Sequence, residues 1–125
     1  MRLTTTDASF LYTETVSGPM HIASVYILEG ELAFWVGGRR IEASAGAFVY
    51  GPRGIPHTFM VTSAQARFLV GVEPAGFDAF LRALAEPAST RTLPPDSVQP
   101  PDPVRLTAVA AEYGIEILGP PGLPD

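Results

Sequence analysis

The chain has 125 residues, enough for one domain that buries about two thirds of the surface exposed by its unfolded form. Its 8 Lys and Arg against 13 Asp and Glu give a net charge of −5, which makes nucleic acid an unsuitable partner. Cysteine is absent, which excludes disulfides, thiolate nucleophiles and cysteine-based zinc sites, so any metal site has to use His, Asp and Glu.

The first 20 residues are mixed and rich in hydroxyl groups, with one apolar cluster at Phe10-Leu11-Tyr12 and a break at Gly18-Pro19. No window of the sequence approaches the roughly eighteen uninterrupted apolar residues of a membrane span. The N-terminus also lacks the apolar run of a signal peptide. We therefore expect a cytoplasmic protein with no membrane partner.

From His21 to Val72 the sequence has the pattern of short β-strands. The segments are apolar and β-branched, and Gly, Pro and Ser separate them at even spacing. The Gly37-Gly38 loop suits a primed hairpin turn. The expected strands cover residues 22–28, 32–36, 39–43, 47–50, 57–62 and 66–72. This spacing predicts a sandwich or a small barrel.

After Pro74 the apolar period changes from two residues to about four, which predicts a helix that ends at Pro87. Residues 87–101 contain five prolines and are expected to form a stiff, extended connector. The predicted apolar face of the helix consists of Phe77, Phe80, Leu81 and Leu84.

A second short helix is expected after this connector. Asp102 has the position of an N-cap with Pro103 in the first turn, and Gly114 stops the helix. Residues 115–118 form either a last short strand or a docking tail. The predicted apolar face consists of Val104, Leu106, Val109 and Ala110.

The stretch from Gly46 to His57 combines a strand, a tight turn and the start of another strand. Gly51 and Gly54 can adopt positive φ, and the two prolines of the turn have a fixed φ, so the imidazole of His57 is presented from a rigid corner. A small β-protein would aim a metal ligand into a pocket in this way.

Residues 26–121 resemble the cupin superfamily, and within it the small single-domain quercetin 2,3-dioxygenase-like cupins. The resemblance rests on Tyr26-Ile27-Leu28-Glu29-Gly30-Glu31-Leu32, on the Gly37-Gly38 hairpin and on the Gly46 to His57 block. It implies an all-β jelly-roll barrel with two short C-terminal helices. Three regions follow: an atypical N-terminal segment at 1–25, barrel strands at 26–73, and helices, connector and tail packing on the barrel at 74–125.

In such cupins two histidines and a glutamate of a first motif and one histidine of a second motif hold a divalent metal. His57 matches the histidine of the second motif, and Gly30 matches the glycine that closes the first. Counting back from Gly30 puts the glutamate on Ala23 and the two histidines among residues 16–19, where the chain has no histidine. Val61 also replaces the usual asparagine of the second motif. Most of the implied metal site is therefore missing.

His21 offers a partial replacement. It lies two residues before Ala23, so both share the inward face of a strand, and a slip or bulge would bring His21 near His57. Two histidines could hold Fe, Mn, Ni, Cu or Zn weakly, with water or substrate completing the coordination shell. The alternative is two ordinary hydrogen-bonded imidazoles in a barrel.

Residues 7–25 carry a second, weaker resemblance. Asp7-Ala8-Ser9-Phe10-Leu11-Tyr12 and Pro19-Met20-His21-Ile22-Ala23 are similar to the N-terminal opening of bacterial wax ester synthase/diacylglycerol acyltransferases. The His-His-x-x-x-Asp-Gly active site of those enzymes is absent from this chain, so acyl transfer is not predicted. Chance similarity over a short apolar stretch is the alternative.

Three functional hypotheses remain open, and they leave enzymatic activity undecided. The first is a metal-dependent, quercetin dioxygenase-like oxygenase of small aromatic substrates. The second is a non-catalytic small-molecule-binding or structural cupin that has lost its metal. The third is a displaced or truncated gene product without a selected activity. The first two place a small-molecule ligand in the barrel, and a homodimer paired through edge strands is expected throughout. Aromatic residues of the strands that line either a pocket or the core are Phe34, Trp35, Phe48, Phe59 and Phe68.

Overall fold

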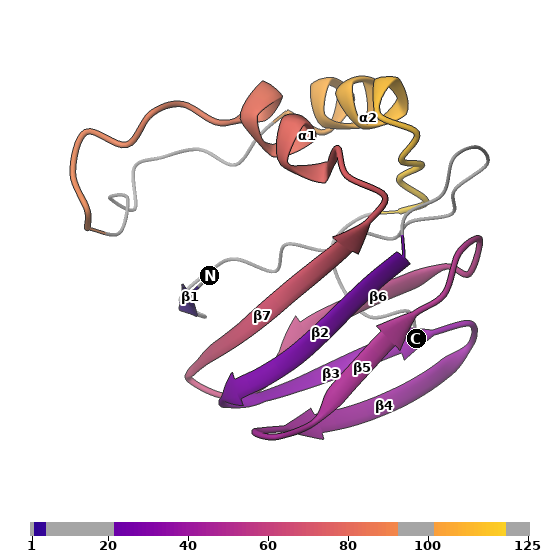
Figure 1. Ribbon diagram of the computed structural model, residues 1–125, viewed down its shortest axis with the longest axis vertical. Coiled ribbons are helices and arrows are strands. Elements are labelled where there is room, and N and C mark those ends of the chain that lie inside the picture. Colours follow the sequence, from indigo (N-terminus) through magenta and orange to yellow (C-terminus); the bar gives the residue numbers. More distant parts are fainter. Residues whose placement is uncertain (1, 5–21, 93–101, 120–125) are drawn as a thin grey trace.

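The computed structural model describes residues 2–4, 22–92 and 102–119 (Figure 1). They form two antiparallel sheets and two short helices, α1 (Phe77–Leu84) and α2 (Pro103–Glu112). No helix among these residues is long and apolar enough to cross a membrane. The strands are β1 (Arg2–Thr4), β2 (Ile22–Glu29), β3 (Glu31–Val36), β4 (Arg39–Ser44), β5 (Phe48–Gly51), β6 (His57–Val61) and β7 (Gln65–Glu73).

The two sheets face each other as the layers of a jelly roll. One sheet has the strand order β1-β7-β2-β5 and the other the order β4-β3-β6. The chain passes from one sheet to the other after β2, β4, β5 and β6, so from β2 onward consecutive strands alternate between the layers except for the β3–β4 hairpin (Figure 1). The all-β jelly roll with two short helices that the sequence predicts is confirmed.

The turns lie where the glycines of the sequence place them. Gly37 and Gly38 have φ values of 55° and 83°, as a primed hairpin turn requires, and Val36 pairs with Arg39 across this turn. Gly30, with φ 86°, connects β2 to β3. A Cβ on Gly30 would lie 2.3 Å from the carbonyl oxygen of Gln65, so only glycine fits this close approach between the two sheets.

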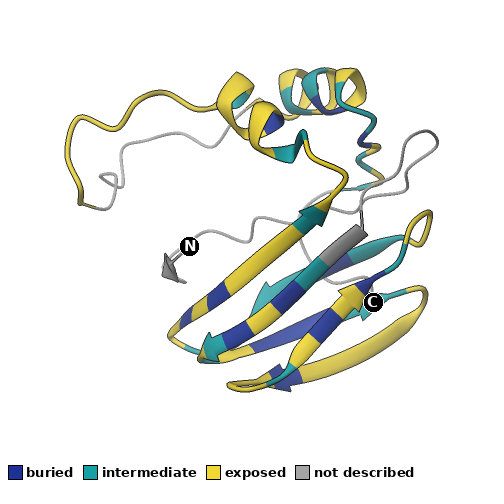
Figure 2. Ribbon diagram, in the orientation of Figure 1, coloured by how far each residue is buried: buried dark blue, intermediate teal, exposed yellow. Residues whose placement is uncertain are grey.

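The core lies between the two sheets and follows the alternation of the strands (Figure 2). The ring of Phe59 links the layers, because its centroid lies 5.8 Å from that of Phe34 and 5.7 Å from that of Phe68. Fully buried side chains from both sheets surround it. The buried residues of this core are Val25, Ile27, Leu32, Phe34, Ala43, Val49, Ala66 and Phe68.

The two helices form a second, smaller cluster beyond the end of β7 (Figure 1). Its buried residues are Phe80, Ala110 and Ile115. Leu81 and Val104 belong to the predicted apolar faces of the helices but are exposed, so only part of each predicted face is buried. Each helix packs mainly against the other. This contact buries only part of the apolar face of each helix.

The ends of α2 agree with the sequence. The carboxylate of Asp102 accepts a hydrogen bond of 3.1 Å from the backbone N–H of Val104, and Gly114 follows the helix with φ 74°. Of the two alternatives for residues 115–118, the structure has no strand there and only a single bridge residue at Ile117. Within the proline-rich connector, residues 93–101 lie outside the described residues.

Candidate functional site

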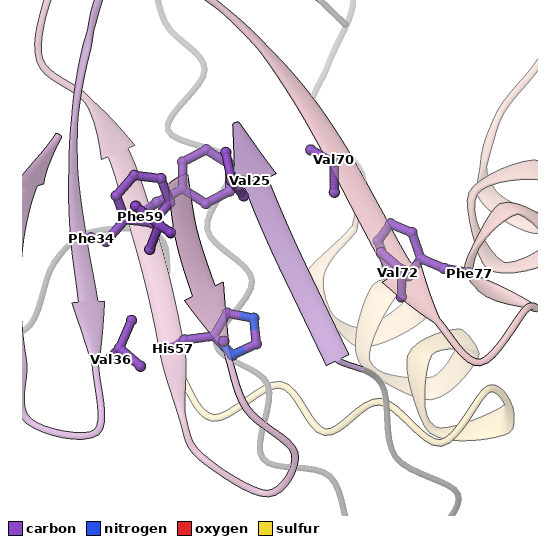
Figure 3. A pocket seen from close by; sticks show the side chains of 10 residues that line it. Val25, Phe34, Val36, His57, Phe59, Val70, Val72 and Phe77 are labelled. Carbon is purple, nitrogen blue, oxygen red and sulfur yellow. The ribbon is translucent and has the colours of Figure 1, made fainter. Parts of the chain in front are cut away.

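A pocket with a cavity volume of about 80 Å³ lies between the two sheets at one end of the barrel (Figure 3). Among the described residues that line it, His57 contributes a polar side chain, the imidazole. The others are one glycine and residues with aliphatic or aromatic side chains. The lining residues are Val25, Phe34, Val36, Val49, Gly51, His57, Phe59, Val70, Val72 and Phe77.

Strand alternation explains why these side chains meet. On β7, Ala66 and Phe68 point inward and are buried in the core. Val70 and Val72 continue the same face toward the pocket. Val70 is 45% exposed, so the pocket opens to solvent at this strand. Phe77, the first residue of α1, adds a ring at the mouth beside Val72 (Figure 3).

His57 begins β6 and lies opposite Val36 of β3. The turn before it positions the ring, because Nδ1 lies 3.2 Å from the carbonyl oxygen of Ile55. A carbonyl oxygen only accepts, so in this hydrogen bond Nδ1 of His57 donates to the carbonyl oxygen of Ile55. The sequence prediction that a rigid corner presents His57 to a pocket agrees with this geometry.

Gly51 has a different role from the one expected. Gly54 has φ 69°, but Gly51 is a residue of β5 without a positive φ, so the expectation of positive φ is wrong for Gly51. A Cβ on Gly51 would lie 3.4 Å from Nδ1 of His57 and 3.5 Å from two ring carbons. The imidazole ring therefore lies against the backbone of β5 at Gly51, and a methyl group at this position would make ordinary van der Waals contact with the ring.

The aromatic residues of the strands divide between core and surface. Phe34 and Phe59 line the pocket and also pack in the core, and Phe68 is a core residue alone. Phe48 points to solvent. Val70 and Val72 of β7 were not predicted to line a pocket. Strand alternation identifies the residues that point inward, but it does not identify the space left between them.

The described residues do not fit the metal site implied by the cupin resemblance. In the described ranges, no group of three His, Cys, Asp or Glu side chains is close enough to hold a metal ion. Backbone register places Ala23 directly opposite Gly51, so the position expected for the glutamate does lie beside the strand that packs on His57, but it carries no carboxylate. His21 lies outside the described residues, and its pairing with His57 stays a prediction.

Comparison with known proteins gives one family. Residues 15–72 match the family model of the cupin domain. The chain is 27% identical over 74 residues to quercetin 2,3-dioxygenase of Bacillus subtilis (strain 168), which covers 59% of this chain and 22% of that enzyme. The chain therefore spans less than a quarter of the length of that curated relative.

Two solved structures are also similar. The cupin domain of Schizosaccharomyces pombe Cnp3 aligns with a TM-score of 0.45 and 16% identity, over 61% of this chain and 56% of that chain. The protein TT1209 from Thermus thermophilus aligns with a TM-score of 0.42 and 30% identity, over 50% of this chain and 58% of that chain.

Proposed function

Because residues 15–72 match the cupin domain, we propose that the chain is a small-molecule-binding cupin whose barrel takes an apolar or aromatic group without a metal. One observation supports this proposal above all: the pocket presents one imidazole and otherwise aliphatic and aromatic groups, with no carboxylate among its described lining residues. Ligand pockets are typically concave and mostly apolar, with few polar groups that fix orientation. His57 is that polar group here.

The size of the cavity limits the ligand. About 80 Å³ is roughly half of the 150 Å³ that accommodates benzene in an apolar protein cavity. A single ring therefore enters only in part, and the remainder of the ligand lies at the mouth beside Val70 and Phe77. The expected ligands are small aromatic or branched aliphatic molecules with one hydrogen-bonding group for the imidazole.

Phenol and toluene form a matched pair of probes, because they have similar shapes and differ in the hydroxyl group. We expect both to shift the backbone amide signals of Gly51, His57 and Val72 in an NMR titration, and phenol to bind more tightly. Val70→Phe should weaken phenol binding at least tenfold by filling the mouth. Val104→Phe, an equally apolar change on the exposed face of α2, is the control. Shifts that cluster away from the pocket, or that survive in Val70→Phe, would contradict the proposal.

A second candidate is metal-dependent oxygenation of a small aromatic substrate. It is favoured by the similarity to quercetin 2,3-dioxygenase over 74 residues and by the position of His57 at the pocket. It requires His57 and His21 to bind a metal together. Reconstitution with Fe, Mn, Ni, Cu or Zn followed by metal analysis decides between the candidates. The oxygenase requires close to one equivalent that is lost in His57→Ala, whereas the metal-free cupin retains less than about a tenth of an equivalent.

A further inference from the structure

The outer face of the four-stranded sheet carries a continuous row of large apolar side chains. In register, Tyr26 of β2 lies opposite Leu69 of β7 on one side and opposite Phe48 of β5 on the other. These side chains are 43%, 57% and 63% exposed, and Tyr50 in the next register position of β5 is 49% exposed. We call these four residues the outer aromatic row.

The outer aromatic row lies in the size range of the largest apolar patch on a typical monomer, about 300–600 Å², and such patches are often functional. With side chains of this size about half exposed, the row presents on the order of 400 Å² of mostly apolar surface. Patches of this size on soluble proteins commonly mark an interaction site. The surface is about half of the roughly 800 Å² that each partner contributes to a standard interface, so a partner also has to contact the polar residues around the row.

The charges on the same face suggest what the partner is. Arg67 and Glu73 both belong to β7 and both point outward, because Ala66, Phe68 and Val72 occupy the inward positions between them. They lie about 20 Å apart along the strand, one on either side of the row. A two-fold axis that lies between the two faces and runs across β7 at the level of Val70 therefore brings Arg67 of one copy against Glu73 of the other.

We propose that a second copy of the chain covers this face, in a symmetric dimer whose four-stranded sheets pack face to face. The outer aromatic rows of both copies form the apolar centre, and two Arg67–Glu73 pairs between copies flank it. Ser24 and Gly71 lie in register beside the row and leave a shallow strip next to Leu69 and Tyr26 that can accept the opposing side chains. This differs from pairing through edge strands, because β7 and β2 lie inside the sheet. It is independent of what the pocket binds.

Sedimentation velocity of the full chain from about 1 to 100 μM tests this dimer. We expect a species of twice the 13.3 kDa chain mass at high concentration. Leu69→Asp and Phe48→Asp should each raise the dissociation constant at least tenfold. Val104→Asp, which adds the same charge to an exposed apolar position on α2, should leave it unchanged. Thermal melting identifies the variants that fold.

Charge reversal adds a test that depends on the symmetry. Arg67→Glu and Glu73→Arg should each weaken the dimer, and the double variant should restore it. Since Glu29 lies opposite Arg67 within one chain, only pairing between copies predicts this rescue. A monomer at 100 μM, a dimer that survives both apolar variants, or a double variant weaker than either single one would overturn the proposal. Survival of Leu69→Asp would indicate pairing through the edge strand β5 instead.

Discussion

The two ends of the barrel are built by the same strands, but the interior of one end is filled by side chains and the interior of the other contains a cavity. At the closed end, Ile27, Leu32 and Phe68 from β2, β3 and β7 are almost completely buried. At the open end, the same three strands contribute valines such as Val36 and Val70, and a cavity remains. Both ends follow the alternation of strands, so the difference lies in side-chain volume. A binding pocket can therefore arise from smaller residues on an unchanged backbone pattern.

Truncation should cost most at the closed end. Phe68→Ala removes a ring that is 1% exposed and packs edge-on against Phe59, so we expect a loss of about 4 kcal/mol in the free energy of unfolding. Val70→Ala, two residues further on the same face, should cost about 1 kcal/mol or less because the side chain already borders a cavity. Urea denaturation measures both. Equal losses would mean that the open end is packed as tightly as the closed one.

The turn at the closed end should be nearly as sensitive. Gly30→Ala introduces a Cβ 2.3 Å from the carbonyl oxygen of Gln65 at a φ of 86°, and we expect a loss of about 3 kcal/mol. Gly46 has a similar φ of 88° but open space around it, so Gly46→Ala isolates the cost of the backbone conformation, about 1 kcal/mol. The difference between the two free energies of unfolding measures the contact. Its absence would show that the two sheets can separate at this turn.

Thr58 lies on the outer face of β6, and a substitution there should raise the free energy of unfolding instead of lowering it. Its side chain is 1% exposed, and within the described residues its Oγ1 has no hydrogen-bond partner. Thr58→Val keeps the shape and removes the unpaired hydroxyl, so the free energy of unfolding should rise by about 1 kcal/mol. Thr62→Val on the exposed loop after β6 is the matched control, with a change near zero. A loss in Thr58→Val would reveal a partner for the hydroxyl.

The smallest effect on stability is expected inside the pocket. Gly51→Ala places a methyl group in ordinary contact with the ring of His57 and reduces the freedom of the unfolded chain, which should raise the free energy of unfolding by about 0.5 kcal/mol. The same methyl group fills space beside His57, so the NMR shifts caused by phenol should shrink. A stable variant that binds phenol as well as the parent chain would place the ligand away from Gly51.

The strands were predictable because the residues that end them act locally. The Gly37-Gly38 turn needs two positive φ values, which glycine supplies without reference to the rest of the fold. The Asp102 cap is equally local. The faces of the helices were not predictable to the same extent. Leu81 and Val104 continue the apolar period, but which part of that period is covered depends on where the second helix lies.

The candidate site also contains some residues that could be predicted from the sequence and others that could not. His57 could be identified from its proline turn, a local feature. The contributions of Val70, Val72 and Phe77 depend on volumes summed across strands from both sheets and on where α1 begins. The closeness of Gly51 to the imidazole is likewise a contact across two strands, with no signal in the spacing of the sequence.

The pairing of β2 with β7 has a consequence for how fast the barrel assembles. Ser24 and Gly71 are register partners, although 47 residues separate them along the chain. The β3–β4 hairpin can close on the order of microseconds because its turn is two residues long. The four-stranded sheet forms only after the chain has closed a long loop, so folding is expected on the order of milliseconds to seconds. The strands that carry the outer aromatic row therefore meet late, and until then their apolar side chains are exposed on an unpaired chain.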